Sequence, residues 1–283
     1  MKQNQHEHNL AQVRKEIFLT AYSCGTAHLA SAYSLVEILY ALYEEGVLRI
    51  NAQEPEWKER DRLILSKGHG SLALYVMLQR KGFFSKEVLR EFSKPGSILG
   101  GEPKFGDIPG VEATTGSLGH GLSLGVGMAM ALKMDRSTAG TYVIVGDGEC
   151  EEGTIWEAVM SAARYHLNRL TVILDCNGLQ KMGPVEHTME IKEWRSRFEA
   201  FGWLVEEIFD GHDVEEILAC LKKENHTDRS RMIIAHTVKG KGVSLMEHNH
   251  NWHFKMPNKR ELKAFMEELK ITQEELDECR KHI

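Results

Sequence analysis

The sequence lacks the features of a membrane or secreted protein. No apolar run reaches the roughly 18 residues of a membrane-spanning helix. The first residues, Met-Lys-Gln-Asn-Gln-His-Glu-His-Asn, contain no apolar core of a secretory signal. We therefore expect a cytoplasmic protein with no membrane partner.

The sequence also lacks a disulfide framework and an excess of positive charge. Its five cysteines, Cys24, Cys150, Cys176, Cys220 and Cys279, are odd in number, widely spaced and without a Cys-x-x-Cys pair, which indicates reduced thiols. The net charge is −6 and no lysine or arginine cluster occurs, which argues against a nucleic-acid partner. The hydrophobic and charged fractions, 42% and 27%, are those of an ordinary globular protein.

The order of the remaining patterns predicts an α/β fold. Buried strands are predicted at 62–66, 141–145, 170–175, 203–209 and 232–236. Helices are predicted at 9–24, 34–45, 71–81, 85–93, 120–134, 153–167, 190–201 and 213–224, with a helical tail at 258–281. The capping box Ser34 with Glu37 opens the helix at 34–45, and Thr272 with Glu275 is another capping box within the tail.

Strands that alternate with helices indicate a mostly parallel sheet with helices on both faces. We expect one domain over residues 1–283, with an N-terminal helical extension and a C-terminal helical tail. The long glycine- and proline-rich loop at 94–117 is of the kind that is usually functional.

Polar residues follow two of the predicted strands. Gly146-Asp147-Gly148 ends one strand, and Asn177 follows the next strand 30 residues later. Since consecutive parallel strands end at the same edge, Asp147 and Asn177 should lie side by side. Carboxylate, amide and carbonyl oxygens suit Mg²⁺ or Ca²⁺ rather than zinc. Taken alone, Gly-Asp-Gly could also be a tight acidic turn without a ligand.

These residues and three further motifs resemble transketolase. Gly-Asp-Gly followed by Asn is similar to the thiamine diphosphate motif. The flanking segments narrow the resemblance: Ser-Lys-Gly-His-Gly at 66–70, Ile-Pro-Gly-Val-Glu-Ala-Thr-Thr-Gly-Ser-Leu at 108–118, and Lys-Gly-Lys-Gly at 239–242 with Trp-His at 252–253. The resemblance spans about residues 10–260 and implies the thiamine diphosphate-binding fold.

The resemblance also implies roles for individual residues. Asp147, Asn177 and the carbonyl of Leu179 would hold the metal, Mg²⁺, for which Ca²⁺ or Mn²⁺ could substitute. The predicted cofactor-binding residues are Ser31, His69, Gly116, Ser117, Leu118, Gly148, Asn177, Lys239 and His253. The predicted catalytic residues are His28, His69 and His253, and the predicted substrate contacts are His28, Glu102 and His253. Glu152 resembles the acidic residue that couples two active sites.

A full transketolase is about twice as long as this chain. The chain resembles the diphosphate-binding half alone, as in split transketolases made of two subunits. The resemblance therefore implies a C-terminal partner subunit that supplies the pyrimidine-binding half, in a heterotetramer (α₂β₂), with sugar phosphates as substrates.

Several residues allow other interpretations. His248, His250 and His253 could suggest zinc, although no cysteine or carboxylate shell accompanies them. The glycine-rich run at 116–127 invites a dinucleotide-binding interpretation, but no strand clearly precedes it. Cys176 could be a reactive thiol or a small buried hydrophobe, and His120 is ambiguous.

Two residues in the predicted substrate-binding region, here called the substrate end of the site, differ from the family pattern. Glu102 stands where transketolases usually have histidine, and Phe254 where they usually have glycine. Two substrate hypotheses stay open. One is ordinary pentose-phosphate ketoses and aldoses; the other is a modified sugar, either branched, such as apulose 4-phosphate, or sulfonated. A 2-oxo acid dehydrogenase component and a non-catalytic cofactor-binding subunit are further alternatives.

Overall fold

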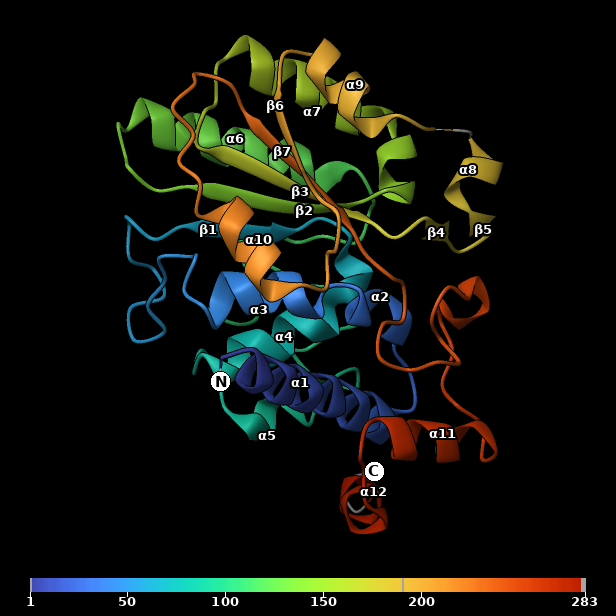
Figure 1. Ribbon diagram of the computed structural model, residues 1–283. Helices are drawn as coiled ribbons and strands as arrows, with labels where there is room; N and C mark the ends of the chain where they lie inside the picture. The colour runs from blue at the N-terminus through green and yellow to red at the C-terminus, as the bar shows by residue number, and fades with distance from the viewer. Residues whose placement is uncertain (1, 190, 281–283) are drawn as a thin grey trace.

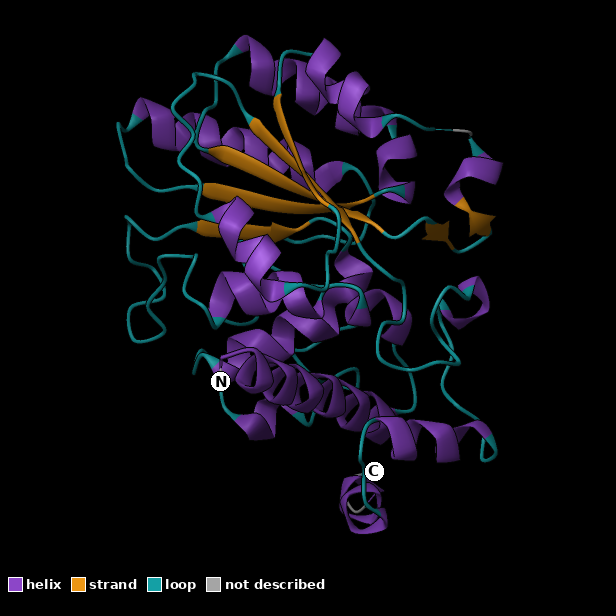
Figure 2. Cartoon of the chain, in the orientation of Figure 1, coloured by secondary structure: helices purple, strands orange, loops and turns teal. Residues whose placement is uncertain are grey.

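A parallel sheet forms the centre of the molecule (Figure 1; Figure 2). The computed structural model describes residues 2–189 and 191–280. The five strands run in the order β1 (Arg62–Leu65), β2 (Thr141–Gly146), β3 (Leu170–Cys176), β7 (Arg231–His236) and β6 (Leu204–Ile208). All neighbouring strands in this sheet are parallel, as predicted. A separate antiparallel hairpin consists of β4 (Leu179–Gln180) and β5 (Gly183–Pro184).

Helices cover both faces of the sheet, which confirms the predicted layers (Figure 1). One face carries α6 (His120–Met134), α7 (Gly153–Arg164) and α9 (Trp194–Ala200). The other carries α2 (Leu29–Tyr33), α3 (Val36–Tyr43), α4 (Ser71–Arg80) and α10 (Val214–Leu221). Beyond that layer lie α1 (Lys2–Cys24), α5 (Lys86–Leu89), α11 (Glu261–Glu268) and α12 (Gln273–Arg280), while α8 (Val185–Thr188) follows the hairpin. None of the described helices is long and apolar enough to cross a membrane.

The central strands are buried on both faces because their alternate side chains enter two different cores. On β2, Val143 and Val145 pack on the side of α6 and α7, whereas Ile144 packs among the helices of the opposite face. Burying one such side chain contributes about 1.5–3 kcal/mol. This explains why the strands could be recognised in the sequence as continuous β-branched runs.

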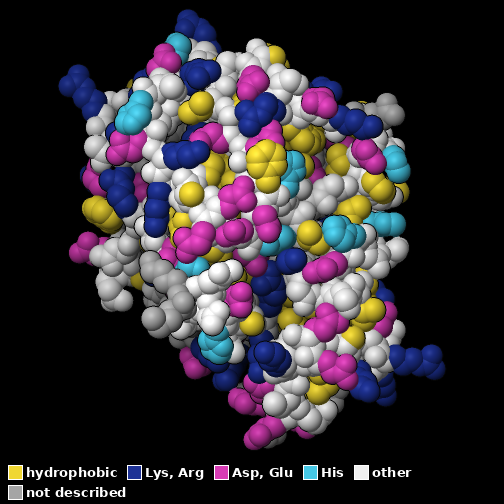
Figure 3. All heavy atoms as spheres, in the orientation of Figure 1, with side chains coloured by type: hydrophobic (Ala, Val, Ile, Leu, Met, Phe, Trp, Pro, Cys, Tyr) yellow, Lys and Arg dark blue, Asp and Glu magenta, His cyan; other side chains and the backbone are white. Residues whose placement is uncertain are grey.

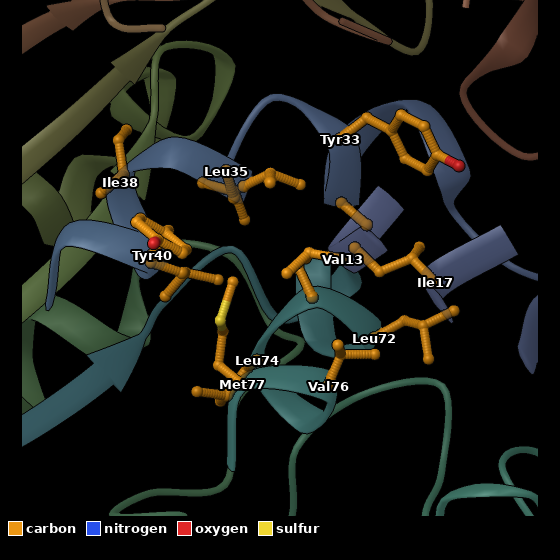
Figure 4. Packing of buried hydrophobic residues seen from close by; sticks show 14 of the residues in the cluster. Val13, Ile17, Tyr33, Leu35, Ile38, Tyr40, Leu72, Leu74, Val76 and Met77 are labelled. Atoms are coloured by element: carbon orange, nitrogen blue, oxygen red, sulfur yellow. The ribbon is translucent and has the colours of Figure 1, made fainter. Parts of the chain in front are cut away.

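The opposite core extends outward from the sheet to a second layer of helices. In Figure 4, Val13 and Ile17 of α1 face Leu72 and Val76 of α4. All four side chains are almost completely buried. The N-terminal helix is therefore part of the core rather than a loosely attached extension.

One predicted capping box is wrong and the other is confirmed. Helix α3 begins at Val36, and Ser34 does not cap it. The Ser34 hydroxyl instead lies 2.7 Å from Asp175 Oδ2, a tertiary partner in the sheet. In the second box, the Thr272 N–H donates to Glu275 Oε2 at 2.8 Å and the Glu275 N–H donates to Thr272 Oγ1 at 3.2 Å.

Several other helix boundaries in the structure differ from the predicted ones. The first helix begins at Lys2 rather than residue 9, and the predicted helix at 85–93 is only α5. The predicted helix at 190–201 begins at Trp194 in the structure, and residue 190 lies outside the described residues. The tail is two helices, and its predicted last residue, 281, is also outside them. The short α2 and the β4–β5 hairpin were not predicted.

The close packing of α6 on the sheet yields a stability prediction. A Cβ at Gly125 would lie 2.4 Å from Val143 Cγ2, and Val143 is fully buried in β2. Overpacking costs about 1–3 kcal/mol, against about 1 kcal/mol gained from helix propensity. We expect Gly125→Ala to lower the free energy of unfolding, measured by urea denaturation, by about 1 kcal/mol.

Gly127→Ala is the matched control, because a Cβ there meets nothing within 4 Å. It lies on the same helix and should leave stability unchanged or raise it by up to about 1 kcal/mol. Equal destabilisation by both substitutions would contradict the packing argument.

Candidate functional site

A cavity of about 290 Å³ lies where the carboxyl ends of β1, β2 and β3 meet the loops that follow them. Most of the predicted site residues line it: His28, His69, Glu102, Gly116, Leu118, Asp147, Gly148, Asn177, Leu179, Lys239 and His253. Parallel α/β sheets place ligand sites at this edge. Residues more than 200 positions apart in the chain thus converge on one cavity.

Three predicted site residues do not line this cavity. Ser31 is fully buried on α2, and its hydroxyl finds no hydrogen-bond partner among the described residues. Ser117 is exposed. Glu152 is exposed at the N-cap of α7, where its side chain packs close to Gly119 at the start of α6. Their assigned roles stay predictions.

The cavity also contains residues that sequence reasoning missed: Lys67, Gly146, Glu149, Gln180 and Lys181. Lys67 stands inside the Ser-Lys-Gly-His motif and Glu149 directly follows Gly-Asp-Gly, so both had a signal in the sequence. Gln180 and Lys181 belong to the unpredicted hairpin.

Two of the three predicted metal ligands, Asp147 and Asn177, lie together because β2 and β3 pair in register. Gly146 is opposite Asp175, which brings the loops that follow both strands side by side. Asp147 Oδ1 and Oδ2 accept the N–H groups of Gly148 and Gly178 at 2.8 and 2.5 Å. Asn177 Oδ1 accepts the Leu179 N–H at 3.1 Å. Each of these oxygens keeps a free lone pair for a cation.

The electrostatics of this edge fit a divalent cation. Burial, and then the nearby Asp175 carboxylate, raise the pKa of Asp147 to about 6. A buried carboxylate with a raised pKa is stabilised when a cation binds beside it. The donor set of carboxylate, amide and backbone carbonyl is the all-oxygen shell of Mg²⁺ or Ca²⁺. The residues present therefore fit the metal that the sequence predicts.

Asp175 connects the ends of the strands below the cavity. Its fully buried carboxylate accepts from Lys67, Thr237 and Ser34, and from the Asn177 amide at 3.2 Å. Although burial alone would raise its pKa, Lys67 and the hydroxyl donors hold that pKa below the ordinary value. The buried ion pair thus anchors the loops that carry the candidate ligands.

Three histidines gather at the mouth of the cavity. The rings of His28, His69 and His253 lie 5.3–5.5 Å apart, centroid to centroid. Burial, reinforced by nearby lysines, lowers the pKa of His28 to about 4 and that of His253 to about 3, and lowers that of His69 as well. All three are therefore neutral at pH 7, and each ring can both donate and accept a hydrogen bond.

The hydrogen bond between Lys239 and His253 fixes a tautomer. Lys239 Nζ lies 3.1 Å from His253 Nδ1 and donates to the Leu179 carbonyl at 2.9 Å. Because an ammonium group can only donate, Nδ1 of His253 accepts and its Nε2 carries the proton. Burial, and then Lys67, lower the pKa of Lys239 to about 8.

A buried network holds the segment that carries this lysine. Glu37 Oε1 accepts from Arg14 at 2.5 Å, and Glu37 Oε2 lies 2.9 Å from His212 Nδ1. His212 Nε2 accepts the Val238 N–H at 2.7 Å, and Arg14 Nε donates to the Lys241 carbonyl at 2.9 Å. The backbone on both sides of the cavity lysine is thereby tied to α1 and α3.

The two departures from the family pattern both lie at the cavity mouth. The Glu102 carboxylate covers Gly116 so closely that a Cβ there would lie 2.0 Å from Glu102 Oε2. The Phe254 ring is 4.6 Å from the His28 ring and 59% exposed. An acidic acceptor and an aromatic surface therefore border the space in front of the histidines.

The alternative interpretations find little support. The described residues contain no group of three or more His, Cys, Asp or Glu side chains that could hold a metal ion. Helix α6 follows a loop rather than a strand, unlike a dinucleotide-binding unit. Cys176 is partly buried, and burial, then Asp147 and Asp175, raise its pKa to about 12, which argues against a reactive thiol. Basic and acidic side chains alternate on the face in Figure 3, without a continuous basic stripe among those coloured.

The family described as "Transketolase, thiamine diphosphate binding domain" matches residues 17–279. This chain belongs to the transketolase family. Within that family it corresponds to the cofactor-binding subunit of the two-subunit enzymes, because it covers such subunits almost completely.

Three relatives illustrate the position of the chain among transketolases. One subunit of an apulose-4-phosphate transketolase from Phocaeicola vulgatus is 41% identical over 265 residues, which is 93% of each chain. A 6-deoxy-6-sulfo-D-fructose transketolase subunit of a Clostridium species is 39% identical over 244 residues, 86% of this chain and 87% of that one. The transketolase crystal structure from Campylobacter jejuni has a TM-score of 0.84 at 29% identity and covers 96% of this chain. This chain spans only 46% of that longer transketolase.

The buried Glu149 of this transketolase subunit leads to a prediction about stability. Its buried carboxylate accepts from Ser66 at 2.5 Å, the Gly119 N–H at 2.8 Å and the Gly146 N–H at 3.0 Å. Glutamine in its place would turn an NH₂ group toward one of these donors. We expect Glu149→Gln to lower the free energy of unfolding by about 1–3 kcal/mol in urea denaturation. Glu157→Gln, at an exposed position on α7, is the control and should change stability little; the carboxylate has no such role if the two variants are equally stable.

Proposed function

We propose that this chain is the cofactor-binding subunit of a thiamine diphosphate- and Mg²⁺-dependent transketolase whose donor is a modified, anionic ketose. The enzyme would transfer a two-carbon ketol unit from that ketose to an aldose, together with a C-terminal partner subunit. The observation that carries the substrate assignment is Glu102 at the mouth of the cavity. The named relatives, which act on apulose 4-phosphate and a sulfo-sugar, support the same direction.

The chain's own residues would divide the work at the cofactor end. Asp147, Asn177 and the Leu179 carbonyl would hold Mg²⁺, which neutralises the diphosphate. When bound, thiamine diphosphate supplies the electron sink for breaking and remaking a carbon–carbon bond beside a carbonyl. The protein would position the cofactor, exclude water and move protons.

The neutral histidines suit hydrogen bonding to the oxygens at the reacting carbons. His253 carries its proton on Nε2, because Nδ1 accepts from Lys239. In this neutral state it can donate a hydrogen bond from Nε2 to a substrate oxygen. His28 and His69 stand beside it with lowered pKa values, so both are neutral at pH 7 and each can donate or accept a hydrogen bond.

The substrate end supports a sugar other than an ordinary pentose phosphate. Glutamate is normally an anionic acceptor at pH 7, whereas histidine can also donate. The Glu102 side chain lines the cavity and is exposed, so its carboxylate is available to a sugar hydroxyl. Phe254 narrows the same mouth beside His28. The cofactor end keeps the family motifs while the substrate end has changed.

The metal assignment predicts a loss of cofactor binding. Asp147→Ala and Asn177→Ala should each lower the Mg²⁺-dependent affinity for thiamine diphosphate by at least about 10-fold, because each removes an oxygen ligand. Both residues follow strands rather than filling the core, so the variants should fold. Calorimetric titration with the cofactor, in the presence and absence of Mg²⁺, measures the effect. Asp135→Ala, at the exposed end of α6, is the control and should leave the affinity unchanged. Unchanged affinity in both Asp147→Ala and Asn177→Ala would contradict the metal assignment.

The proposed complex with a C-terminal subunit leads to two predictions, one about the need for the partner and one about the substrate. The chain alone should show no ketol transfer, and mixing it with a C-terminal transketolase subunit should restore turnover. On that complex, a donor panel of apulose 4-phosphate, 6-deoxy-6-sulfofructose and xylulose 5-phosphate should show preference for a modified sugar. Glu102→His should shift the preference toward xylulose 5-phosphate.

Two results would contradict this prediction in different ways. Robust ketol transfer by the chain free of any partner would refute the two-subunit assignment. Preference of the wild-type complex for xylulose 5-phosphate, unaltered in Glu102→His, would refute the modified-sugar assignment alone.

A further inference from the structure

A second cavity, of about 670 Å³, lies at the other end of the sheet from the candidate site. It is bounded by the amino ends of β2, β3 and β7, by the chain after α3, and by the loop 222–226 after α10. In Figure 1 these strand ends lie on the side away from the β4–β5 hairpin. The volume of this amino-end cavity is within the range of small-molecule sites, roughly 300–1,000 Å³. The cavity is therefore large enough for a ligand of its own.

A row of three side chains on paired strands forms the floor of the amino-end cavity. Tyr142 on β2 is opposite Thr171 on β3, and Thr171 is opposite Arg231 on β7. Residues opposite each other in neighbouring strands point to the same face of a sheet. The hydroxyl groups of Tyr142 and Thr171 form no hydrogen bond with any other described residue. Two hydroxyl donors are therefore left for a ligand.

Two guanidinium groups meet at the rim of this cavity. Arg49 Nη2 and Arg169 Nη1 each donate to the Thr138 carbonyl oxygen at 2.7 Å. Arg49 also contacts the buried Asp61, with its Nη2 3.0 Å from Asp61 Oδ1. Arg169 is exposed and forms no ion pair with the described residues. Two like charges so close repel each other, so an anion placed between them would lower the electrostatic energy.

The wall at the end of α10 carries three more cations. Arg231 is buried; it contacts the Glu206 carboxylate and donates to the Cys220 carbonyl at 2.5 Å, which satisfies the end of the helix. Lys223 Nζ lies 3.2 Å from Glu206 Oε1, so one carboxylate serves two cations. Lys222 is exposed, and its ammonium group has no hydrogen bond or ion pair within the described part of the chain. This wall therefore has cationic charge to spare.

The charge balance of the amino-end cavity is positive, although the whole chain has a net charge of −6. Five cationic side chains line it: Arg49, Arg169, Lys222, Lys223 and Arg231. Four carboxylates line it or act on its cations: Asp61, Glu224, Glu206 and Glu59. The two cations without a carboxylate partner among the described residues, Arg169 and Lys222, lie on different sides of the cavity. They are the groups available to an anionic ligand.

We propose that the amino-end cavity is a second ligand site, which binds a small polyanion carrying two or more phosphate groups. One phosphate would lie against the guanidinium groups of Arg49 and Arg169, whose N–H forks suit phosphate oxygens. Another would meet the ammonium group of Lys222. The Tyr142 and Thr171 hydroxyls would donate to the part of the ligand that lies over the floor. The site is separate from the cofactor cavity and does not depend on the proposed function.

Inorganic triphosphate is the probe that tests this proposal. It is titrated calorimetrically against the full chain without Mg²⁺, which the cofactor cavity would need in order to hold a diphosphate. Salt at roughly 0.15 M screens weak attraction to the surface. We expect one triphosphate per chain at this site, with a Kd of about 0.1 mM or below. Sulfate, which has a single anionic group, should bind at least about 10-fold more weakly, because it cannot reach both sides of the cavity.

Arg169→Gln and Lys222→Gln remove the two unpaired charges. Each should raise the Kd for triphosphate about 10-fold or more, the loss expected for a charge-assisted contact. Both positions are exposed, so the variants should unfold in urea at the same concentration as the wild type. Arg164→Gln, at an exposed position at the end of α7 and outside the cavity, is the matched control. Its Kd should equal that of the wild type.

Four results would overturn the proposal. The first is the absence of triphosphate binding up to about 10 mM. The second is a Kd that is the same in the wild type and in both cavity variants, which would place the anion elsewhere on the chain. The third is an equal loss of affinity in Arg164→Gln, the result of unspecific attraction to positive charge. The fourth is equal affinity for sulfate and triphosphate, which would contradict contacts to two phosphate groups.

Discussion

The buried carboxylate of Asp175 is the interaction on which the site depends. It lies at the end of β3, the middle strand, and accepts from groups that follow β1, β7 and α2. Removing one partner of a buried ion pair costs about 3–5 kcal/mol, because the other charge is left uncompensated. The segments that follow β1, β7 and α2 are therefore fixed to one carboxylate.

That constraint also organises the charges around the cofactor end. Asp175 compensates Lys67, and after burial it is the group that raises the pKa of the neighbouring Asp147 most. Burial and the lysines in turn keep the histidines neutral. The raised pKa of Asp147, the two buried lysines and the neutral histidines thus arise from one buried arrangement of charges.

The sequence predicted the layers and the convergence of Asp147 with Asn177, because buried parallel strands leave continuous β-branched runs and a regular spacing. It failed where a tertiary contact overrides a local pattern. Ser34 reads as a helix cap, yet its hydroxyl is used by Asp175. Lys181 had no signal, because a two-residue turn between strands of two residues is too short to recognise. Asp175 itself reads as an ordinary strand end.

Substitutions at the cofactor end of the cavity and at its substrate end differ in how many contacts within the protein they remove. Asp147, Asn177 and Lys239 are buried and hydrogen-bonded to neighbouring segments, so a substitution there removes contacts within the protein as well as a group of the site. Glu102 is exposed and lies on a loop. Substitutions at exposed loop positions usually alter stability by less than about 0.5 kcal/mol. A transketolase fold can therefore change the sugar it accepts through its loops while the strand ends continue to hold the same cofactor.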